Sequence, residues 1–322
     1  MNVRALRLAA LPIVGLTLTL SACGGQTQAS GGSGGNGSGG VSGEVVVDGS
    51  STVQPLTSAA GELFAEQEPG VNVSVATSGT GGGFEKFCQG QTDISDASRP
   101  IKDEEKAICE KNGITYSELH VATDALTVVV SKDNDFVDCL TTDELKTMWG
   151  PQAEDKVTTW KQVNAEFPDE PLELYGPGTD SGTFDYFTDE INGEEGVSRT
   201  DYNASEDDNV IVQGVSGSAN ALGYFGYTYF EENADALKAV EIDSGAGCVA
   251  PSAEAAQDGT YAPLARPLFI YVSNNAAAEK PQVKAFIDFY ATNDADIAEA
   301  AQYIPLNDEQ RSELESAVGS IA

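Results

Sequence analysis

Apolar and polar positions recur with two distinct periods from residue 44 onward. Residues 44–48 form a short apolar run that predicts a buried strand, and apolar residues over 53–64 recur at helical spacing. Residues 71–75 alternate between apolar and polar, which is typical of a half-buried strand. A helix beginning near Phe84 and a short strand at 92–95 follow. Strands therefore alternate with helices, and this order indicates an α/β fold with a mostly parallel sheet.

The rest of the chain continues the same pattern. The predicted strands are 125–131, 172–175, 221–227 and 266–272, and the predicted helices are 141–149, 184–191, 282–290 and 308–317. The part from residue 44 to residue 322 is long enough for one large domain or two ordinary ones.

The first 43 residues differ in composition from everything that follows. Arg4 and Arg7 precede an apolar stretch at 8–20, and small residues stand directly before Cys23, as in a secretory signal peptide. The stretch is short for a transmembrane helix, although an uncleaved anchor is an alternative. Residues 24–43 contain ten Gly and four Ser, so we expect a flexible tether there.

Charge and cysteine content narrow the possible partners. The chain carries 51 acidic and 17 basic residues, a net charge of −34, so its surface repels nucleic acid and anionic lipid. An anion site must then attract its ligand through local geometry. Four cysteines follow Cys23, an even number that predicts two disulfides in an exported chain, with three pairings open and buried free thiols as the alternative. They are Cys88, Cys109, Cys139 and Cys248. Since His120 is the single histidine, we expect no zinc site.

Three segments rich in glycine and hydroxyl side chains each lie between a predicted strand and a predicted helix. They are 49–52, which includes Ser51, then 79–83 and 180–183. Helix N-termini offer unpaired N–H groups to anions, and in open α/β sheets such loops gather at the carboxyl ends of strands. Each segment alone is better explained by ordinary helix capping. Together they predict an anion site, and the absence of G-x-x-x-x-G-K-[ST] excludes a nucleotide-hydrolysing P-loop.

Six segments taken in order resemble a known family. They are Asp48–Thr52, Ser78–Phe84, Ser95–Pro100, Gly178–Thr183, Leu222–Tyr227 and Arg266–Leu268. Over almost everything after residue 43, the chain is similar to the phosphate-binding subunits of Pst-type ABC transporters. The resemblance implies a two-lobed type II periplasmic-binding-protein fold, with two α/β lobes joined by two hinge strands. Lobe one would comprise 44–126 plus 270–322, and lobe two 127–269.

The resemblance also implies the ligand contacts, residue by residue. Thr52, Thr80 and Asp96 match lobe-one contacts, Val53 matches a backbone N–H donor, and Ser181, Gly182 and Thr183 match lobe-two contacts. Many members carry an arginine four residues before the lobe-two serine, where this chain has Pro177. We expect Arg99 to replace that arginine, with a structural salt bridge as the alternative.

Asp96 is the residue expected to select phosphate over sulfate. A carboxylate in an anion site needs a hydrogen-bond donor on the ligand, and phosphate near neutral pH keeps a proton that sulfate lacks. Asp96 is therefore predicted to select phosphate. The alternative is that Asp96 caps the following turn.

Taken together, these features predict a monomeric, extracytoplasmic receptor that binds inorganic phosphate with high affinity between its lobes and delivers it to the permease subunits of an ABC importer. Cys23 would carry the lipid that anchors it to the cell membrane. The implied lobes favour Cys88–Cys109 and Cys139–Cys248 as disulfides, each within one lobe. We expect no enzymatic activity and no cofactor. The alternatives are a receptor for sulfate or molybdate, or a secreted phosphatase, for which neither an activated nucleophile nor a metal cluster is visible.

Overall fold

The computed structural model of the chain describes residues 40–321. The predicted signal peptide, Cys23 and most of the predicted tether lie outside the described residues. Within 40–321, every helix is too short or too polar to cross a membrane.

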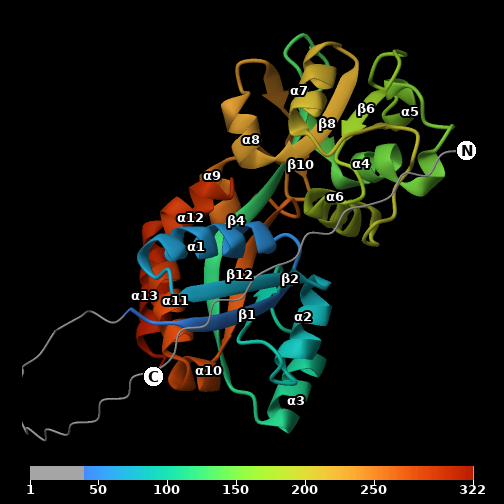
Figure 1. Cartoon of the computed structure of the whole chain (residues 1–322). Coiled ribbons are helices and arrows are strands. Elements are labelled where there is room, and N and C mark those ends of the chain that lie inside the picture. Colours follow the sequence, from blue (N-terminus) through green and yellow to red (C-terminus); the bar gives the residue numbers. More distant parts are fainter. Residues whose placement is uncertain (1–39, 322) are drawn as a thin grey trace, which may run out of the picture. The chain divides into compact units, whose positions relative to one another are not determined.

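The strands and helices follow one another in the order that the sequence predicts, with additional short elements between them (Figure 1). The first part contains β1 (Gly43–Gly49), α1 (Gln54–Gln67), β2 (Val71–Thr77), α2 (Gly79–Phe87), β3 (Ile94–Ala97), α3 (Asp103–Asn112) and β4 (Tyr116–Ser131). The middle part contains β5 (Cys139–Thr141), α4 (Thr142–Trp149), η1 (Pro151–Ala153), α5 (Trp160–Val163), β6 (Glu173–Gly176), α6 (Gly182–Phe187), η2 (Thr188–Asn192), β7 (Asn203–Ala204), α7 (Asp208–Ser216), β8 (Ala221–Gly226), α8 (Tyr227–Glu232), β9 (Leu237–Ala239), β10 (Glu241–Asp243), β11 (Cys248–Val249) and α9 (Ala253–Gln257). The last part contains β12 (Ala265–Ser273), α10 (Asn274–Glu279), α11 (Pro281–Thr292), α12 (Asp294–Ala300) and α13 (Asp308–Gly319).

The main sheet has the strand order β2-β1-β3-β12-β4-β8-β6-β7, and β9 pairs with β4. Pairing is parallel between β1 and its neighbours β2 and β3, and again between β6 and its neighbours β7 and β8. It is antiparallel where β12 meets β3 and β4, and where β4 meets β8. The prediction of a mostly parallel sheet therefore holds at both ends of the sheet but not at the long strands in its middle.

Two large hydrophobic cores lie along the length of β4. Leu119, Val121 and Ala122 pack in the first core with α1, α11 and α13, whereas Leu126 and Val128 pack in the second with α4 and β8. The strand β12 also contributes to the first core, through three of its apolar residues. A 16-residue strand can serve two cores because, at a rise of about 3.3 Å per residue, it is roughly 50 Å long. The expected two-lobed type II α/β fold is confirmed, while the proposed lobe boundaries remain a prediction.

The disulfide pairing expected from the lobes is confirmed. Cys88 pairs with Cys109 and joins the end of α2 to α3, with their Cα atoms 4.2 Å apart. Cys139 pairs with Cys248 and joins β5 to β11 across 6.0 Å. Cross-links of this kind stabilise a fold mainly by restricting its unfolded chain.

Candidate functional site

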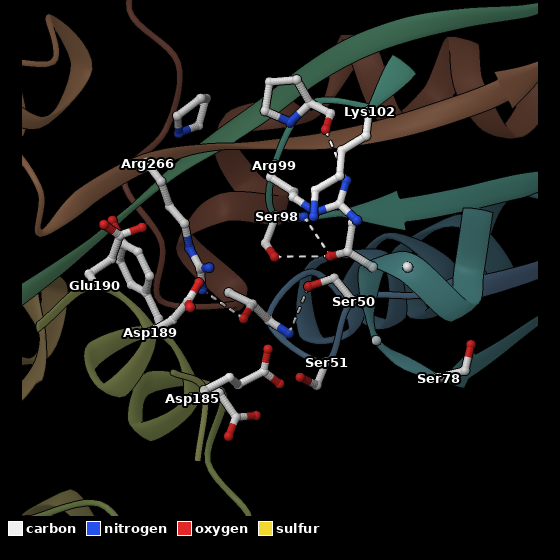
Figure 2. Close-up of a pocket in the computed structure, with 18 residues that line it drawn as sticks. Ser50, Ser51, Ser78, Ser98, Arg99, Lys102, Asp185, Asp189, Glu190 and Arg266 are labelled. Carbon is white, nitrogen blue, oxygen red and sulfur yellow. Dashed lines mark hydrogen bonds between the residues drawn. The ribbon is translucent and has the colours of Figure 1, made fainter. Parts of the chain in front are cut away.

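A cavity of about 670 Å³ opens where the loops after β1, β2 and β3 face the helical segment α6–η2. Hydroxyl and cationic side chains come from one side, and acidic side chains come from α6–η2 (Figure 2). The lining includes Ser50, Ser51, Thr52, Ser78, Thr80, Ser98, Arg99, Lys102, Asp185, Tyr186, Asp189, Glu190, Glu195 and Arg266. The volume of this cavity and its polar lining are typical of a binding site for a small charged ligand.

The loop between β1 and α1 is held in place by the backbone beneath it. Gly49 has φ +153°, and a Cβ atom there would lie 2.1 Å from the carbonyl oxygen of Asp96, so only glycine fits. The Ser50 amide donates to that same carbonyl oxygen at 2.9 Å. The Thr52 amide donates to Ser50 Oγ at 3.2 Å, and Val53 is the N-cap residue of α1 without a side-chain capping bond. Ser51 and Thr52 consequently line the cavity directly before a helix N-terminus.

The glycine-rich segment after β2 is the first turn of α2 rather than the loop that the sequence predicts. The helix can begin at Gly79 because its glycines allow α2 to approach β1 closely: a Cβ atom on Gly83 would lie 2.5 Å from the Gly49 Cα atom. This position brings Thr80 Oγ1 within 3.1 Å of Ser98 Oγ, and the Ser98 amide donates to Thr80 Oγ1 at 3.2 Å. Two hydroxyl groups therefore face the cavity together, and Ser98 was not singled out from the sequence.

The segment 181–183 lies against the β1–α1 loop, although the two are far apart in sequence. Ser181 caps α6 by accepting a bond from the Thr183 amide, and a Cβ atom on Gly182 would lie 3.0 Å from Thr52 Oγ1. None of the three residues belongs to the lining of the larger cavity. One of them, Thr183, lines a second cavity of about 130 Å³. The structure thus places Gly182, a predicted contact of lobe two, against Thr52, a predicted contact of lobe one.

Arg266 is a cavity residue to which sequence reasoning gave no role of its own. Its Nη2 donates to Thr52 Oγ1 at 2.9 Å, and its Nε donates to Asp124 Oδ2 at 3.3 Å. Its guanidinium carbon lies 3.5 Å from the ring centroid of Tyr186, which is a close cation–π contact. The signal was present in the Arg266–Leu268 motif, but no sequence spacing connects that motif with the β1–α1 loop.

Arg99 also lines the cavity, but its guanidinium is paired. It donates to both carboxylate oxygens of Glu105, at 2.9 and 2.8 Å, and to the Pro100 carbonyl oxygen. Burial raises the pKa of Glu105, and the bonds from Arg99 and Lys102 outweigh it, so that this pKa lies below its ordinary value. The role of Arg99 as the cationic contact stays a prediction, with the salt bridge that was its alternative present in the structure.

Asp96 lies within β3, not in the loop after it, and is absent from the cavity lining. Successive residues of a strand point to opposite faces, so Asp96 shares the face of Ile94 and points toward α1. There its Oδ1 accepts a bond from Thr57 Oγ1 at 2.8 Å, and its Oδ2 is buried without a partner among the described residues. Burial raises the pKa of Asp96 to about 8. The structure thus buries Asp96, as the prediction requires, but outside the lining of the larger cavity, and its role as a phosphate contact stays a prediction.

The acidic groups that line the cavity lie on the side opposite the β1–α1 loop. Figure 2 shows Asp185 and Asp189 on α6–η2, facing Ser51 and the guanidinium group of Arg266. Partial burial raises the pKa of Asp185, with Glu195 adding to the rise and Arg266 opposing it. Asp185 also lies two residues after the 181–183 segment, in the first turn of α6. It is therefore a cavity carboxylate placed close to the predicted contacts.

Neither His120 nor a metal cluster belongs to this site. His120 Nε2 lies 2.9 Å from the Ala122 carbonyl oxygen on β4, and burial lowers its pKa. Among residues 40–321, the one group of potential metal ligands is Cys139, Glu241 and Cys248, whose two sulfur atoms form a disulfide. The cavity is lined by hydroxyl groups, the guanidinium groups of Arg99 and Arg266, the Lys102 side chain and four carboxylates.

Comparison with known proteins assigns the chain to a class. The family model of the PBP superfamily domain matches residues 34–294, which is most of the chain. This class comprises two-lobed binding proteins, in agreement with the fold and the position of the cavity.

Individual relatives define the family more narrowly. The chain is 49% identical to Protein SphX of Synechocystis over 265 residues, 82% of this chain and 79% of the relative. It is 42% identical to the phosphate-binding protein PstS of Staphylococcus saprophyticus over 95% of this chain and 93% of the relative. A crystal structure of a possible phosphate binding protein from Planctomyces limnophilus is 44% identical, with a TM-score of 0.83 over 87% of this chain and 99% of that one. The chain belongs to the family of PstS-type phosphate-binding proteins.

Proposed function

We propose that the chain binds inorganic phosphate in the cavity described above and delivers it to an ABC importer. The observation that carries the proposal is the meeting of Thr52, Gly182 and Arg266 at one point. The guanidinium bonds the threonine hydroxyl at 2.9 Å, and the glycine lies against the same hydroxyl. Phosphate offers four oxygens, and an arrangement of helix N-termini, hydroxyl groups and one guanidinium supplies the donors that they need.

We assign the donors from both sides of the cavity. Ser51, Thr52 and Thr80 would donate through hydroxyl groups and Val53 through its backbone N–H, while Ser181, Gly182 and Thr183 would reach the ligand from α6. Arg266 is a better candidate for the cationic contact than Arg99, because Nη1 and Nη2 of Arg99 already donate to Glu105. Negative charge on the rest of the surface opposes an anion, so local donors must supply the affinity.

The proposal predicts tight one-to-one binding of phosphate. Calorimetric titration of residues 40–322, a compact unit with its own hydrophobic cores, is expected to show saturable binding of phosphate at moderate salt and no response to sulfate. Equal binding of both anions would leave a two-lobed receptor for tetrahedral oxyanions. No binding of either anion would contradict the proposed function, and turnover of a phosphate ester would favour a hydrolase instead.

Selection of phosphate over sulfate gives a second prediction. A carboxylate that reads the phosphate proton must face the ligand, and there are two candidates. Asp185 lines the cavity, whereas Asp96, like Ser181 and Gly182, lies outside its lining. Asp185→Asn is expected to reduce the phosphate-to-sulfate affinity ratio by at least tenfold, because an amide no longer requires a proton on the ligand. Competition titrations of both anions measure the ratio. Asp96→Asn is the matched control, and a loss of selectivity confined to that variant would return the role to Asp96.

The place of the protein in the cell follows from the same proposal. A receptor for an importer works outside the cytoplasmic membrane, and Cys23 with its attached lipid would keep it there. The proposed cycle is capture of phosphate between the lobes, closure about the two long strands, and docking of the closed form on the permease. Mass spectrometry of the mature N-terminus checks the lipid on Cys23.

A further inference from the structure

Arg266 connects three parts of the molecule, which are the strand pair β12–β4, the β1–α1 loop and α6. It stands on β12 directly opposite Asp124 on β4, in antiparallel register. Its Nε bonds Asp124, its Nη2 bonds Thr52 of the β1–α1 loop, and its face covers the ring of Tyr186 on α6. The two strands run from one core to the other, so the guanidinium lies at the joint between the lobes.

Two of the three partners of Arg266, Thr52 and Tyr186, are themselves held in place. The Thr52 carbonyl oxygen accepts a bond from the Tyr303 hydroxyl at 2.7 Å, which fixes the loop from behind. The Tyr186 hydroxyl donates to the Pro263 carbonyl oxygen at 2.6 Å, three residues before Arg266, so the ring is tied to the same chain segment as the arginine. Tyr186 is 3% exposed and the Arg266 side chain is 18% exposed. Contacts between groups that are fixed in this way lose little conformational entropy when they form.

Charge and geometry both favour the stacked position of Arg266. A guanidinium can bond with its edge and stack with its face at the same time, which a lysine ammonium cannot do. A cation over an aromatic ring contributes more when water is excluded, and the buried Tyr186 ring meets that condition. Two of the five N–H groups of Arg266 bond Asp124 and Thr52; the others have no protein acceptor within residues 40–321 and remain for a ligand.

We propose that Arg266 and Tyr186 form a latch between the lobes, in which the stacked guanidinium holds α6 against the β1–α1 loop and keeps the phosphate donors of both lobes together. The inference rests on the proposed function and deepens it. Tyr186 acts as a positioning residue, because it orients Arg266 without needing to touch the ligand. Weakening the latch lowers the fraction of molecules in the binding-competent arrangement, and the apparent dissociation constant rises in proportion.

The test compares variants that alter the stack and the charge separately. Tyr186→Phe keeps the ring and removes only the hydroxyl, Tyr186→Leu removes the stack, and Arg266→Lys keeps the charge without the planar face. Tyr261→Leu is the matched control, since Tyr261 is buried in the same core as Tyr186 and, within residues 40–321, forms neither a hydrogen bond nor a cation–π contact with Arg266. The readouts are the phosphate dissociation constant and rate, and the radius of gyration of the phosphate-free protein by X-ray scattering.

We expect Tyr186→Phe to bind phosphate within about threefold of the unaltered chain, and Tyr186→Leu to bind about tenfold more weakly, through faster dissociation. Tyr186→Leu should also have a larger radius of gyration without phosphate, which Tyr261→Leu should not. In the double variant, Arg266→Lys should cost less affinity than it does alone, because the stack is already lost.

Contrary results separate the latch from the proposed function. Additive effects of Arg266→Lys and Tyr186→Leu, or equal losses in Tyr186→Leu and Tyr261→Leu, overturn the latch while phosphate binding stands. If the unaltered chain binds no phosphate, the proposed function fails, but scattering from the phosphate-free variants still shows whether the latch holds the lobes. An unchanged radius of gyration in Tyr186→Leu would then overturn the latch as well.

Discussion

Gly49→Ala is expected to lower the free energy of unfolding by on the order of 4 kcal/mol, a loss in the range of exceptional single substitutions. The φ of +153° at Gly49 is a conformation that L side chains rarely adopt, and the added Cβ atom would lie 2.1 Å from the Asp96 carbonyl oxygen and 2.8 Å from its amide nitrogen. Both atoms belong to the backbone of β3, which pairs with β1 at this position. The clash therefore cannot be relieved by rotating a side chain.

Urea unfolding followed by circular dichroism measures the loss. Gly319→Ala is the matched control, because that glycine ends α13 with nothing within 4 Å of a Cβ atom, and alanine is the better helix former. The Gly49→Ala variant should also lose phosphate affinity, since Gly49 holds the loop that carries Ser51 and Thr52. A Gly49→Ala protein as stable as the Gly319→Ala protein would show that β1 and β3 do not approach as closely as described.

Asp96→Asn is expected to remove a large part of the pH dependence of stability. Burial raises the pKa of Asp96 in the folded chain to about 8, from an ordinary value of 3.8. The folded state thus holds the proton more tightly than the unfolded state. The stability associated with that proton is fully present below about pH 4 and is lost as the pH rises to about 8, by about 1.4 kcal/mol per pH unit. Asparagine does not titrate, so the variant lacks this loss.

The measurement is the free energy of unfolding of both proteins at several pH values between 4 and 9. The variant is expected to gain stability relative to the unaltered chain as the pH rises, with the difference constant above about pH 8. Asp235→Asn, at an exposed position, controls for the removal of one acidic group from a highly acidic chain. Parallel stability curves for the Asp96→Asn and unaltered proteins would mean that Asp96 is ionised in the folded state at neutral pH.

Local patterns predicted much of the fold. The strands β1, β2, β6, β8 and β12 and the helices α1, α4, α11 and α13 occur close to the predicted ranges, because their periodicity reflects burial on one face. The elements that were not predicted are mostly short, such as β7 with two residues and β11 with two. A strand of two residues is too short to show a hydrophobic period in the sequence. It forms because a neighbouring strand pairs with it.

The candidate site was predicted in its loops and less well in its charged groups. The pairing of Arg99 with Glu105 could have been predicted from the sequence, because Glu105 lies only six residues later. Glu105 is in the first turn of α3, and Lys102 is the N-cap residue of that helix. Arg266 could not have been placed in the same way, because its partner Thr52 is 214 residues away. The two meet because β12 pairs with β3, which in turn pairs with β1, the strand before Thr52.

The sequence by itself determined the order of the elements, the three hydroxyl- and glycine-rich segments at helix starts, and the membership in a family of phosphate-binding proteins. Tertiary structure decided which charged groups face the cavity. The strand β3 continues two residues past its predicted end, and Asp96 therefore points toward Thr57 and α1. Antiparallel pairing of β12 with β4 sets Arg266 opposite Asp124, and the guanidinium group stacks on Tyr186 of α6. Side-chain direction in a sheet reverses at every residue. The direction of these charged groups therefore depends on where a strand ends and with which strand it pairs, and distant segments decide both.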